Sequence, residues 1–247
     1  MDRELKVKSL HKALQVLECF TSESPELGIT EISEKLDLYK SNVHNIISTF
    51  EKLGYIEKNK DNDKYRLGLK ILELAQVISS NISLRKVALP YMQQIADKTG
   101  EIVYLGIPSE GQVIYLDSAC PRNGTPSRSM LGIRAPMYCT AIGKAMLAYL
   151  PENALTQQEM VRYTDNTLLS RDKLKEELKS IRENGFSLDN MEHEYGIKCI
   201  GAPIRSKKGV AVAGISISGP SLRFTKDHIP ALARILLEST ENIEKMI

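Results

Sequence analysis

The sequence predicts an α+β protein made of an N-terminal winged helix-turn-helix, a linker helix and a C-terminal domain built on an antiparallel sheet. Three observations predict this class. Short amphipathic helical patterns and two strand-like runs fill the first 68 residues, an apolar helical pattern follows, and hairpins alternate with amphipathic helices in the remainder. We therefore divide the chain into a winged helix-turn-helix domain (1–68), a linker helix (69–84) and a C-terminal α+β domain (85–247).

The composition narrows the classes of function. A chain of 247 residues, 42% hydrophobic and 26% charged, is typical of an ordinary soluble protein with two modest domains. No run approaches the roughly 18 apolar residues of a membrane span, and the first residues lack an apolar signal region. The four cysteines are scattered, and no two of the four histidines have metal-ligand spacing. We expect a cytoplasmic protein with no membrane contact, no disulfide, no metal site and no cofactor.

The sequence predicts three short helices in the N-terminal domain. Ser9–Phe20 has apolar residues at helical spacing on one face. Thr30 is predicted to cap a second helix, a break of a few residues follows at 37–40, and Ser41 is predicted to cap the third. Gly54 ends that helix as a C-terminal glycine. The last two helices and their tight connection predict a helix-turn-helix.

A short hairpin follows the third helix. The strand-like runs Tyr55–Asn59 and Lys64–Leu67 flank the polar sequence Asp61-Asn62-Asp63, which suits a turn. The hairpin would form the wing of a winged helix-turn-helix.

The third helix has the side chains expected of a DNA reader. Its apolar residues fall on one side of a helical wheel, and its outward side carries amides, hydroxyls and a histidine, which suit base edges in a major groove. The helix start and the lysines of the wing suit phosphates. The candidate DNA-binding residues are Lys40, Ser41, Asn42, His44, Asn45, Ser48, Lys58, Lys60 and Lys64. The alternative is the solvated face of a small structural helix.

The distribution of charge limits the predicted DNA contacts to a small part of the N-terminal domain. The net charge of the whole chain is only +2, and residues 1–68 carry 11 Lys and Arg against 12 Asp and Glu. Residues 40–68 carry six Lys and Arg against four Asp and Glu, a net charge of +2. Phosphate contacts are therefore expected only around the third helix and the wing.

The predicted linker helix is apolar around much of its circumference from Leu69 to Ile82. Because a helix that is apolar all round is normally buried all round, we expect it to pack against a second subunit. The alternative is that it lies wedged between the two domains of one chain.

The remaining residues alternate strands and helices. We expect a hairpin from Ile102–Ile107 and Gln112–Asp117, and a second from Ile197–Ile204 and Val210–Ser218. Amphipathic helices are predicted at Tyr138–Leu150, Ser170–Asn184 and Asp227–Met246. Such a grouping indicates an antiparallel sheet covered by helices.

Three features of this domain indicate a pocket for a small ligand. The sequence Thr140-Ala141-Ile142-Gly143 opens a helix whose free N–H groups suit an anion. Ser216 and Ser218 alternate along one strand, so their hydroxyls share a face. Cys199 lies in the partner strand, and Asp189 is expected on the preceding loop. Taken singly, each residue is better explained as a core thiol, a surface serine or a loop aspartate.

The sequence gives little support for an enzyme. Cys139 or Cys199 with His193 could be drawn as a nucleophile and its base. The sequence has no nucleophile elbow, phosphate-cradling loop or third orienting group. Glu192-His193-Glu194 reads as a polar loop rather than a metal site. We therefore expect no catalytic residues.

Six separated segments resemble the IclR-type bacterial transcriptional regulators. They are SLHKALQVLECF (9–20), LGITEISEKLDLYKSNVHNIISTFEKLGY (27–55), YRLGLKILELA (65–75), GIRAPMYCTAIGKAMLAYL (132–150), GFSLDNMEHEYGIKCIGAPI (185–204) and VAVAGISISGP (210–220). The resemblance implies a GAF- or profilin-like effector domain. It also implies that the effector pocket is lined by Ala141, Ile142, Asp189, Cys199, Ser216 and Ser218.

Three positions depart from the family pattern. Asn42 and Asn45 stand where the family usually has Thr and Arg, and Met191 replaces the first of two acids before a glycine. The loss of the arginine removes a phosphate or guanine contact, so the operator sequence is expected to differ from the family's usual one.

The resemblance implies a ligand-responsive repressor. It would bind a near-palindromic operator in double-stranded DNA as a homodimer or a tetramer, and sense a small organic acid, a sugar acid or an aromatic acid. The alternative is a metabolite-binding module whose helix-turn-helix contacts protein rather than DNA.

Overall fold

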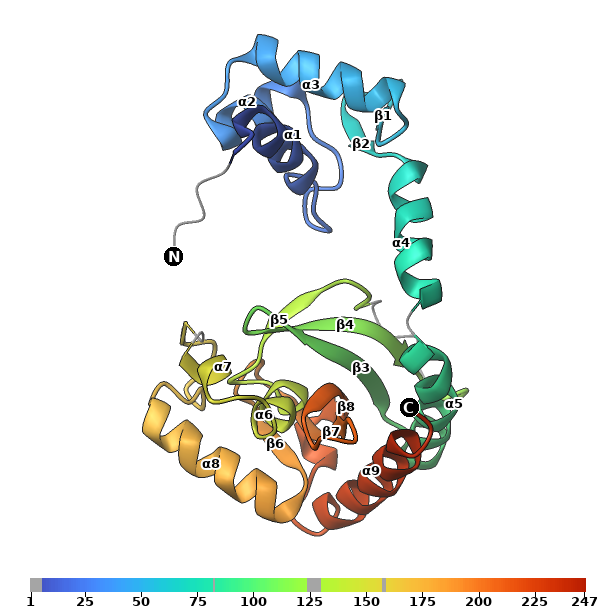
Figure 1. Cartoon of the computed structure of the whole chain (residues 1–247), viewed down its shortest axis with the longest axis vertical. Coiled ribbons are helices and arrows are strands. Elements are labelled where there is room, and N and C mark those ends of the chain that lie inside the picture. Colours follow the sequence, from blue (N-terminus) through green and yellow to red (C-terminus); the bar gives the residue numbers. More distant parts are fainter. Residues whose placement is uncertain (1–5, 82, 124–129, 157–158) are drawn as a thin grey trace. The chain divides into compact units, whose positions relative to one another are not determined.

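The computed structural model describes residues 6–81, 83–123, 130–156 and 159–247 and divides into two compact units, Met1–Asn81 and Ile82–Ile247 (Figure 1). Residues 1–5, 82, 124–129 and 157–158 of the predicted domains, including Ile82 of the predicted linker helix, lie outside the described residues. The elements of the first unit are α1 Lys8–Glu18, α2 Ile29–Leu36, α3 Lys40–Lys52, β1 Ile56–Lys58, β2 Tyr65–Leu67 and α4 Leu69–Asn81.

The first unit is a winged helix-turn-helix, as predicted. The apolar faces of α1, α2 and α3 meet in one cluster, where Val16, Ile32, Val43 and Ile47 are almost fully buried. Strands β1 and β2 pair antiparallel, with Ile56 opposite Leu67. The burial of one stripe on each helix leaves the opposite face of α3 in solvent.

The two predicted helix caps are wrong. Gly28 and Tyr39 stand at the cap positions of α2 and α3, both with extended backbones. The N–H of Gly28 donates to the side chain of Glu31 at 2.6 Å, so this glutamate serves the start of α2 and Thr30 lies inside the helix. The carbonyl of Tyr39 already accepts the first intrahelical bonds of α3, which places Ser41 in the first turn. Hydroxyls one residue inside a helix resemble caps in sequence.

Helix α4 follows the wing directly, where the sequence predicts the linker helix. Its large apolar side chains are exposed rather than buried: the exposed residues are Leu69, Leu72, Leu74, Val77 and Ile78, at 46–71%. Neither their predicted burial against a second subunit nor the alternative between two domains is tested by the single chain.

The second unit is built on a six-stranded antiparallel sheet in the order β5-β4-β3-β8-β7-β6. The strands are β3 Ile102–Ser109, β4 Gln112–Ala119, β5 Arg134–Pro136, β6 Ser187–Asn190, β7 Ile197–Arg205 and β8 Ala211–Pro220. The helices are α5 Ser83–Thr99, α6 Ala141–Leu147, α7 Asn153–Thr156, α8 Arg171–Asn184 and α9 Ile229–Glu244, with the 3-10 turn η1 Ser221–Arg223. Both predicted hairpins, β3–β4 and β7–β8, are confirmed.

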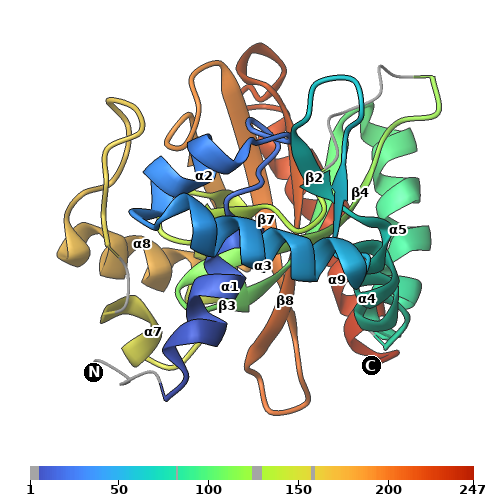
Figure 2. The ribbon, with the colours of Figure 1, turned by 90° about the horizontal axis from the view of Figure 1, so that it is seen from above.

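Helices cover the two faces of this curled sheet. Helices α5 and α9 pack on one face, where Met92, Ile95 and Leu236 are buried against the strands. Helices α6 and α8 lie on the other face, where Ile142 and Leu178 belong to a second apolar cluster (Figures 1 and 2). None of the helices in the described part of the chain combines the length and apolar composition of a membrane span.

Helix α6 approaches the sheet very closely. A Cβ atom at Gly201 of β7 would lie 2.5 Å from the carbonyl carbon of Ala141, and one at Gly143 would lie 2.3 Å from the Cα of Met137. The sequence predicts an amphipathic helix from 138 to 150, but all seven residues of α6 are buried, including Lys144. The amphipathic prediction is wrong because the sheet covers one side of α6 and α8 covers another.

The segment before β7 forms a strand where the sequence predicts a loop. Asp189 lies in the short strand β6, opposite Cys199, rather than in a loop. This edge strand of four residues is too short to show a clear alternating pattern in the sequence.

Candidate functional site

The outward face of α3 carries the predicted DNA contacts. Lys40, Ser41, Asn42, His44 and Asn45 are exposed, and Ser48 is half-buried one turn further along. The buried Val43 and Ile47 fix the rotation of the helix, so these polar groups share the solvent side. The structure therefore brings together the helical part of the predicted DNA-binding set.

The wing lysines differ in their availability. Lys58 pairs with Asp63 at 2.6 Å, and Lys64 pairs with Glu31 at 2.9 Å. Lys60 is exposed and has no ion pair within the described residues. Because the first two lysines already have carboxylate partners, Lys60 is the wing lysine most available to a phosphate.

One exposed aromatic residue was missed by the sequence reasoning. Tyr39, the cap residue of α3, is 83% exposed and stands beside Lys40 at the start of the helix. Tyrosine hydroxyls commonly contact phosphates in protein–DNA interfaces. The sequence does contain a signal for this residue, because Tyr39 is a large aromatic side chain in the short turn between the two helices.

The effector-binding residues predicted from the resemblance meet in one cavity of the second unit. This cavity of about 170 Å³ is lined by residues of α6, β3, β4, β5, β6, β7 and β8 and the segments beside them. The predicted residues on its wall are Ala141, Ile142, Asp189, Cys199, Ser216 and Ser218. An apolar cavity of about 150 Å³ holds benzene, so the volume suits a ligand about the size of one ring.

The wall combines aromatic and polar groups. Tyr104 and Tyr115 meet edge to face with their ring centroids 5.5 Å apart. Cys199 Sγ donates to Ser218 Oγ at 3.1 Å. Asp189 Oδ1 accepts the backbone N–H of Glu192 at 2.7 Å, and burial raises the pKa of Asp189 to about 6. The pocket wall thus combines hydroxyl, thiol and carboxyl groups with a pair of aromatic rings.

The thiols lack the properties of a nucleophile. Burial raises the pKa of Cys139 to about 12 and also raises the pKa of Cys199. Burial lowers the pKa of His193, so its imidazole is neutral at neutral pH. An activated cysteine needs a lowered pKa. Among the described residues there is also no group of three His, Cys, Asp or Glu side chains that could hold a metal ion.

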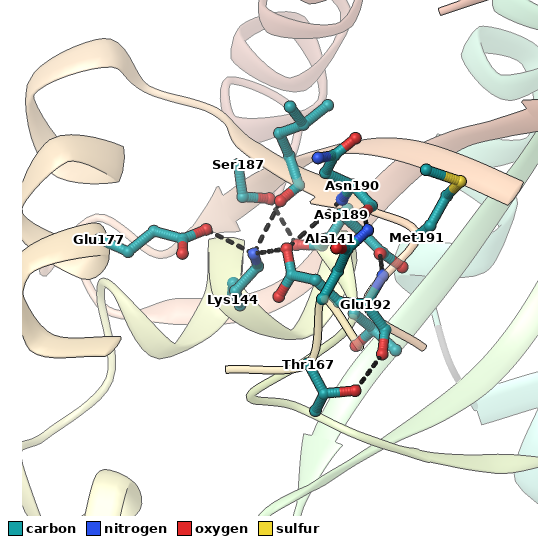
Figure 3. Close-up of polar contacts among 12 residues, drawn as sticks. Ala141, Lys144, Thr167, Glu177, Ser187, Asp189, Asn190, Met191 and Glu192 are labelled. Atoms are coloured by element: carbon teal, nitrogen blue, oxygen red, sulfur yellow. Dashed lines mark hydrogen bonds and ion pairs between the residues drawn. The ribbon is translucent and has the colours of Figure 1, made fainter. Parts of the chain in front are cut away.

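A buried ionic cluster beside the pocket was not expected from the sequence (Figure 3). Lys144 Nζ pairs with Glu177 and with Glu192, the latter at 2.5 Å, and donates to the carbonyl of Leu188 at 2.7 Å. Glu192 was expected in a polar loop, but it is buried with its backbone carbonyl held by Thr167. Its partner is 48 residues away in the chain, so no local pattern could have shown the pair.

The comparisons with known proteins agree along most of the chain. A model of the IclR helix-turn-helix domain matches residues 9–60, and a model described as "Bacterial transcriptional regulator IclR C-terminal" matches residues 76–245. The HTH-type transcriptional regulator XynR of Escherichia coli is 34% identical over 216 residues, 86% of either chain. The transcriptional repressor IclR of Escherichia coli is 26% identical over 96% of this chain and 89% of that one.

Solved structures show the same architecture. The Thermotoga maritima IclR is 32% identical, with a TM-score of 0.78 over 96% of this chain and 98% of that one. An IclR homolog from Microbacterium hydrocarbonoxydans, solved in complex with 4-hydroxybenzoate, is 25% identical, with a TM-score of 0.83 over 96% of this chain and 98% of that one.

Proposed function

This chain belongs to the IclR family of bacterial transcriptional regulators, and we propose that it is a homodimeric repressor that binds a near-palindromic operator and responds to a small organic acid. The family regulates transcription, so the protein is a DNA-binding regulator and not an enzyme. The observation that carries the more specific proposal is the exposed polar face of α3, on which Glu51, near the end of the helix, is the one acidic residue. The sign of regulation follows the relative named as a repressor.

We assign base reading to α3 and phosphate contact to its start and to the wing. Asn42, Asn45 and His44 offer donors and acceptors for base edges. Lys60 and Tyr39 are exposed at the two ends of this surface and suit the sugar-phosphate backbone. This division of labour predicts that helix variants change sequence preference and wing variants change overall affinity.

The exposed apolar side chains of α4 support a dimer. Leu69, Leu72 and Ile78 are each at least 65% exposed, which is unusual for leucine and isoleucine in a helix. A second copy of α4 would bury them and would bring two winged domains to one operator with a fixed half-site spacing. Pairing of such dimers into a tetramer would multiply the DNA contacts further.

The pocket supports sensing of an acid with one ring or an equivalent volume. Its serine hydroxyls can donate hydrogen bonds to an anion, and its two tyrosine rings give the wall an apolar part. The relative bound to 4-hydroxybenzoate makes hydroxylated aromatic acids the first class to test. The effector acts only if it binds the DNA-competent and incompetent dimers with different affinity, a coupling of ~1–3 kcal/mol in typical systems.

Operator selection followed by titration tests this function. Duplexes selected from a random pool by the full chain should be near-palindromic, and affinity should fall steeply with salt because several phosphates are contacted. A small organic acid that binds the chain should shift the affinity for the operator by about fivefold or more. Leu72→Glu should give monomers in sedimentation and lose operator binding.

If the helix-turn-helix contacts protein instead of DNA, the chain should select no operator sequence and show no steep salt dependence. A folded chain that selects no sequence, or whose binding is insensitive to salt, would contradict the repressor proposal. Dimers that persist unchanged in Leu72→Glu would contradict the role of α4 and leave DNA binding standing.

A further inference from the structure

The buried cluster around Lys144 is adjacent to the predicted effector pocket (Figure 3). The fully buried Lys144 pairs with Glu177 of α8 and lies 2.5 Å from Glu192 Oε1. The backbone N–H of Glu192 in turn donates to Asp189 Oδ1 at 2.7 Å. Asp189 is on the pocket wall. The cluster therefore reaches from the interior of the unit to the surface that a ligand would contact.

The charges of this cluster do not balance. One ammonium, Lys144, faces the three carboxyl groups of Glu177, Glu192 and Asp189, and the last two are only 5% and 4% exposed. A buried charge without a counter-ion is costly, and the usual outcome is that the group binds a proton. Glu192 Oε2 is buried without a hydrogen-bond partner among the described residues, so this oxygen is not held in the ionised form by a donor.

The other groups that face Asp189 and Glu192 supply no second positive charge. Burial lowers the pKa of His193 and raises those of Tyr115, Cys139 and Cys199, which leaves all four neutral near pH 7. The titratable groups that line the pocket or act on the two acids are Lys144 of α6, Glu177 of α8, Cys139 before α6, Tyr104 of β3, Tyr115 of β4, Arg134 of β5, Cys199 of β7, and His193 and Glu194 after β6.

Arg134 also lines the pocket, but its side chain is 45% exposed and it is not among the main charges that act on Asp189. Nη1 lies 3.4 Å from Gln112 Oε1 and 4.0 Å from Glu110 Oε2, both at the β3–β4 hairpin. A ligand carboxylate placed beside Asp189 would therefore add negative charge to a region that already has an excess of it.

We propose that the pocket takes up one proton together with each acid effector, and that the Asp189–Glu192 pair holds this proton. This inference rests on the effector-binding function proposed above. A protonated Asp189 donates a hydrogen bond to the effector carboxylate, whereas an ionised Asp189 repels it. The proton is thus a second ligand of the effector site, and no covalent step is involved.

The carboxyl groups of Asp189 and Glu192 determine how effector affinity should change with pH. Burial raises the pKa of Asp189 to about 6 and that of Glu192 to about 7. A bound anion raises both further. Above about pH 7 the empty site is largely ionised and must gain the proton when the anion binds, so affinity falls by up to about tenfold per pH unit. Below about pH 6 the proton is already present, so affinity levels off.

Calorimetry with the full chain tests this inference. Benzoate, 4-hydroxybenzoate, lactate and gluconate are titrated at about pH 6 and about pH 8, each in two buffers of different ionisation enthalpy, with neutral benzamide as the uncharged probe. The difference between buffers gives the protons bound per ligand. We expect close to one proton per acid at the higher pH, much less at the lower pH, and none for benzamide.

Two isosteric variants locate the proton. Asp189→Asn keeps an oxygen for the N–H of Glu192 but has no charge to neutralise. It should lose proton uptake and bind acids at about pH 8 as tightly as the wild type does at about pH 6, a gain that a merely structural role would not produce. Glu192→Gln should reduce the uptake and serves if the first variant does not fold. Glu176→Gln, an exposed neighbour on α8, should behave as wild type.

The outcomes separate the two proposals. If none of the four acids binds the folded chain, effector sensing of this class fails and the inference fails with it. If an acid binds at the higher pH without proton uptake, sensing stands and the inference is overturned. Loss of uptake in His193→Gln with full uptake in Asp189→Asn would assign the proton to the imidazole and would also overturn it.

Discussion

The two units differ in one kind of ion pair: among the described residues only the second unit has a pair around a fully buried lysine. In Met1–Asn81 the ion pairs are at the surface, as between Lys64 and Glu31 with side chains 39% and 46% exposed. In Ile82–Ile247 the cluster of Lys144, Glu177 and Glu192 surrounds a lysine with no exposure at all. Solvent and salt screen the first kind of pair, which can exchange its partner for a phosphate. The second kind cannot exchange partners without unfolding.

This contrast suggests a division between recognition and sensing. A unit that binds DNA needs charges that can meet a polyanion, and the charged side chains of the first unit are exposed to solvent. In the proposal above, the second unit needs a pocket wall whose charge responds to one small anion, and burial strengthens the effect of each charge there. The predictions below test this contrast in order of decreasing effect.

The largest effect is expected for Lys144→Met. Removing the ammonium leaves the buried Glu192 and the half-buried Glu177 without their partner, which should lower the free energy of unfolding by about 3–5 kcal/mol. Because the folded pKa values of Asp189 and Glu192 are raised to about 6 and about 7, these groups favour the folded state most at acidic pH. The loss should therefore be greater at about pH 8 than at about pH 5, as measured by chemical denaturation of the full chain.

The matched control is Lys179→Met, an exposed lysine on α8. We expect a change within about 0.5 kcal/mol for it. Equal destabilisation by the two variants would show that burial does not distinguish these lysines and would remove the contrast between the units.

An intermediate effect is expected for Asn45→Ala on the exposed face of α3. Loss of an amide that reads a base edge should narrow the preference for the selected operator over a scrambled duplex by about 1–3 kcal/mol. Fluorescence anisotropy with both duplexes measures this. A uniform loss of affinity for the two duplexes would instead assign Asn45 to the backbone.

The smallest effect is expected for Lys60→Met in the wing. Loss of one phosphate contact should weaken binding to all duplexes alike and reduce the slope of log affinity against log salt by about 1. Anisotropy at several salt concentrations measures the slope, and Lys179→Met again serves as the control. A change in sequence preference would contradict the assignment of the wing to phosphates.

Much of the fold could be predicted from local patterns. The polar face of α3 follows from the spacing of Val43 and Ile47, and both hairpins of the second unit follow from apolar runs around polar turns. Gly54 has a φ of 81°, as a C-terminal glycine requires. The boundaries were less predictable, since Thr30 and Ser41 lie inside helices that begin one residue earlier.

Local patterns in the chain are enough to specify the types of the elements and the chemistry of the exposed face of α3, because helical and strand periodicities depend on neighbouring residues. The same holds for the alternation that puts Ser216 and Ser218 on one side of β8. The burial of α6 on every side, and the contact of Lys144 with Glu177 and Glu192, 33 and 48 residues away, arise only from the packing of distant segments. The charge state of the pocket depends on that packing, since burial and distant partners, rather than neighbours in sequence, set the pKa of each carboxyl.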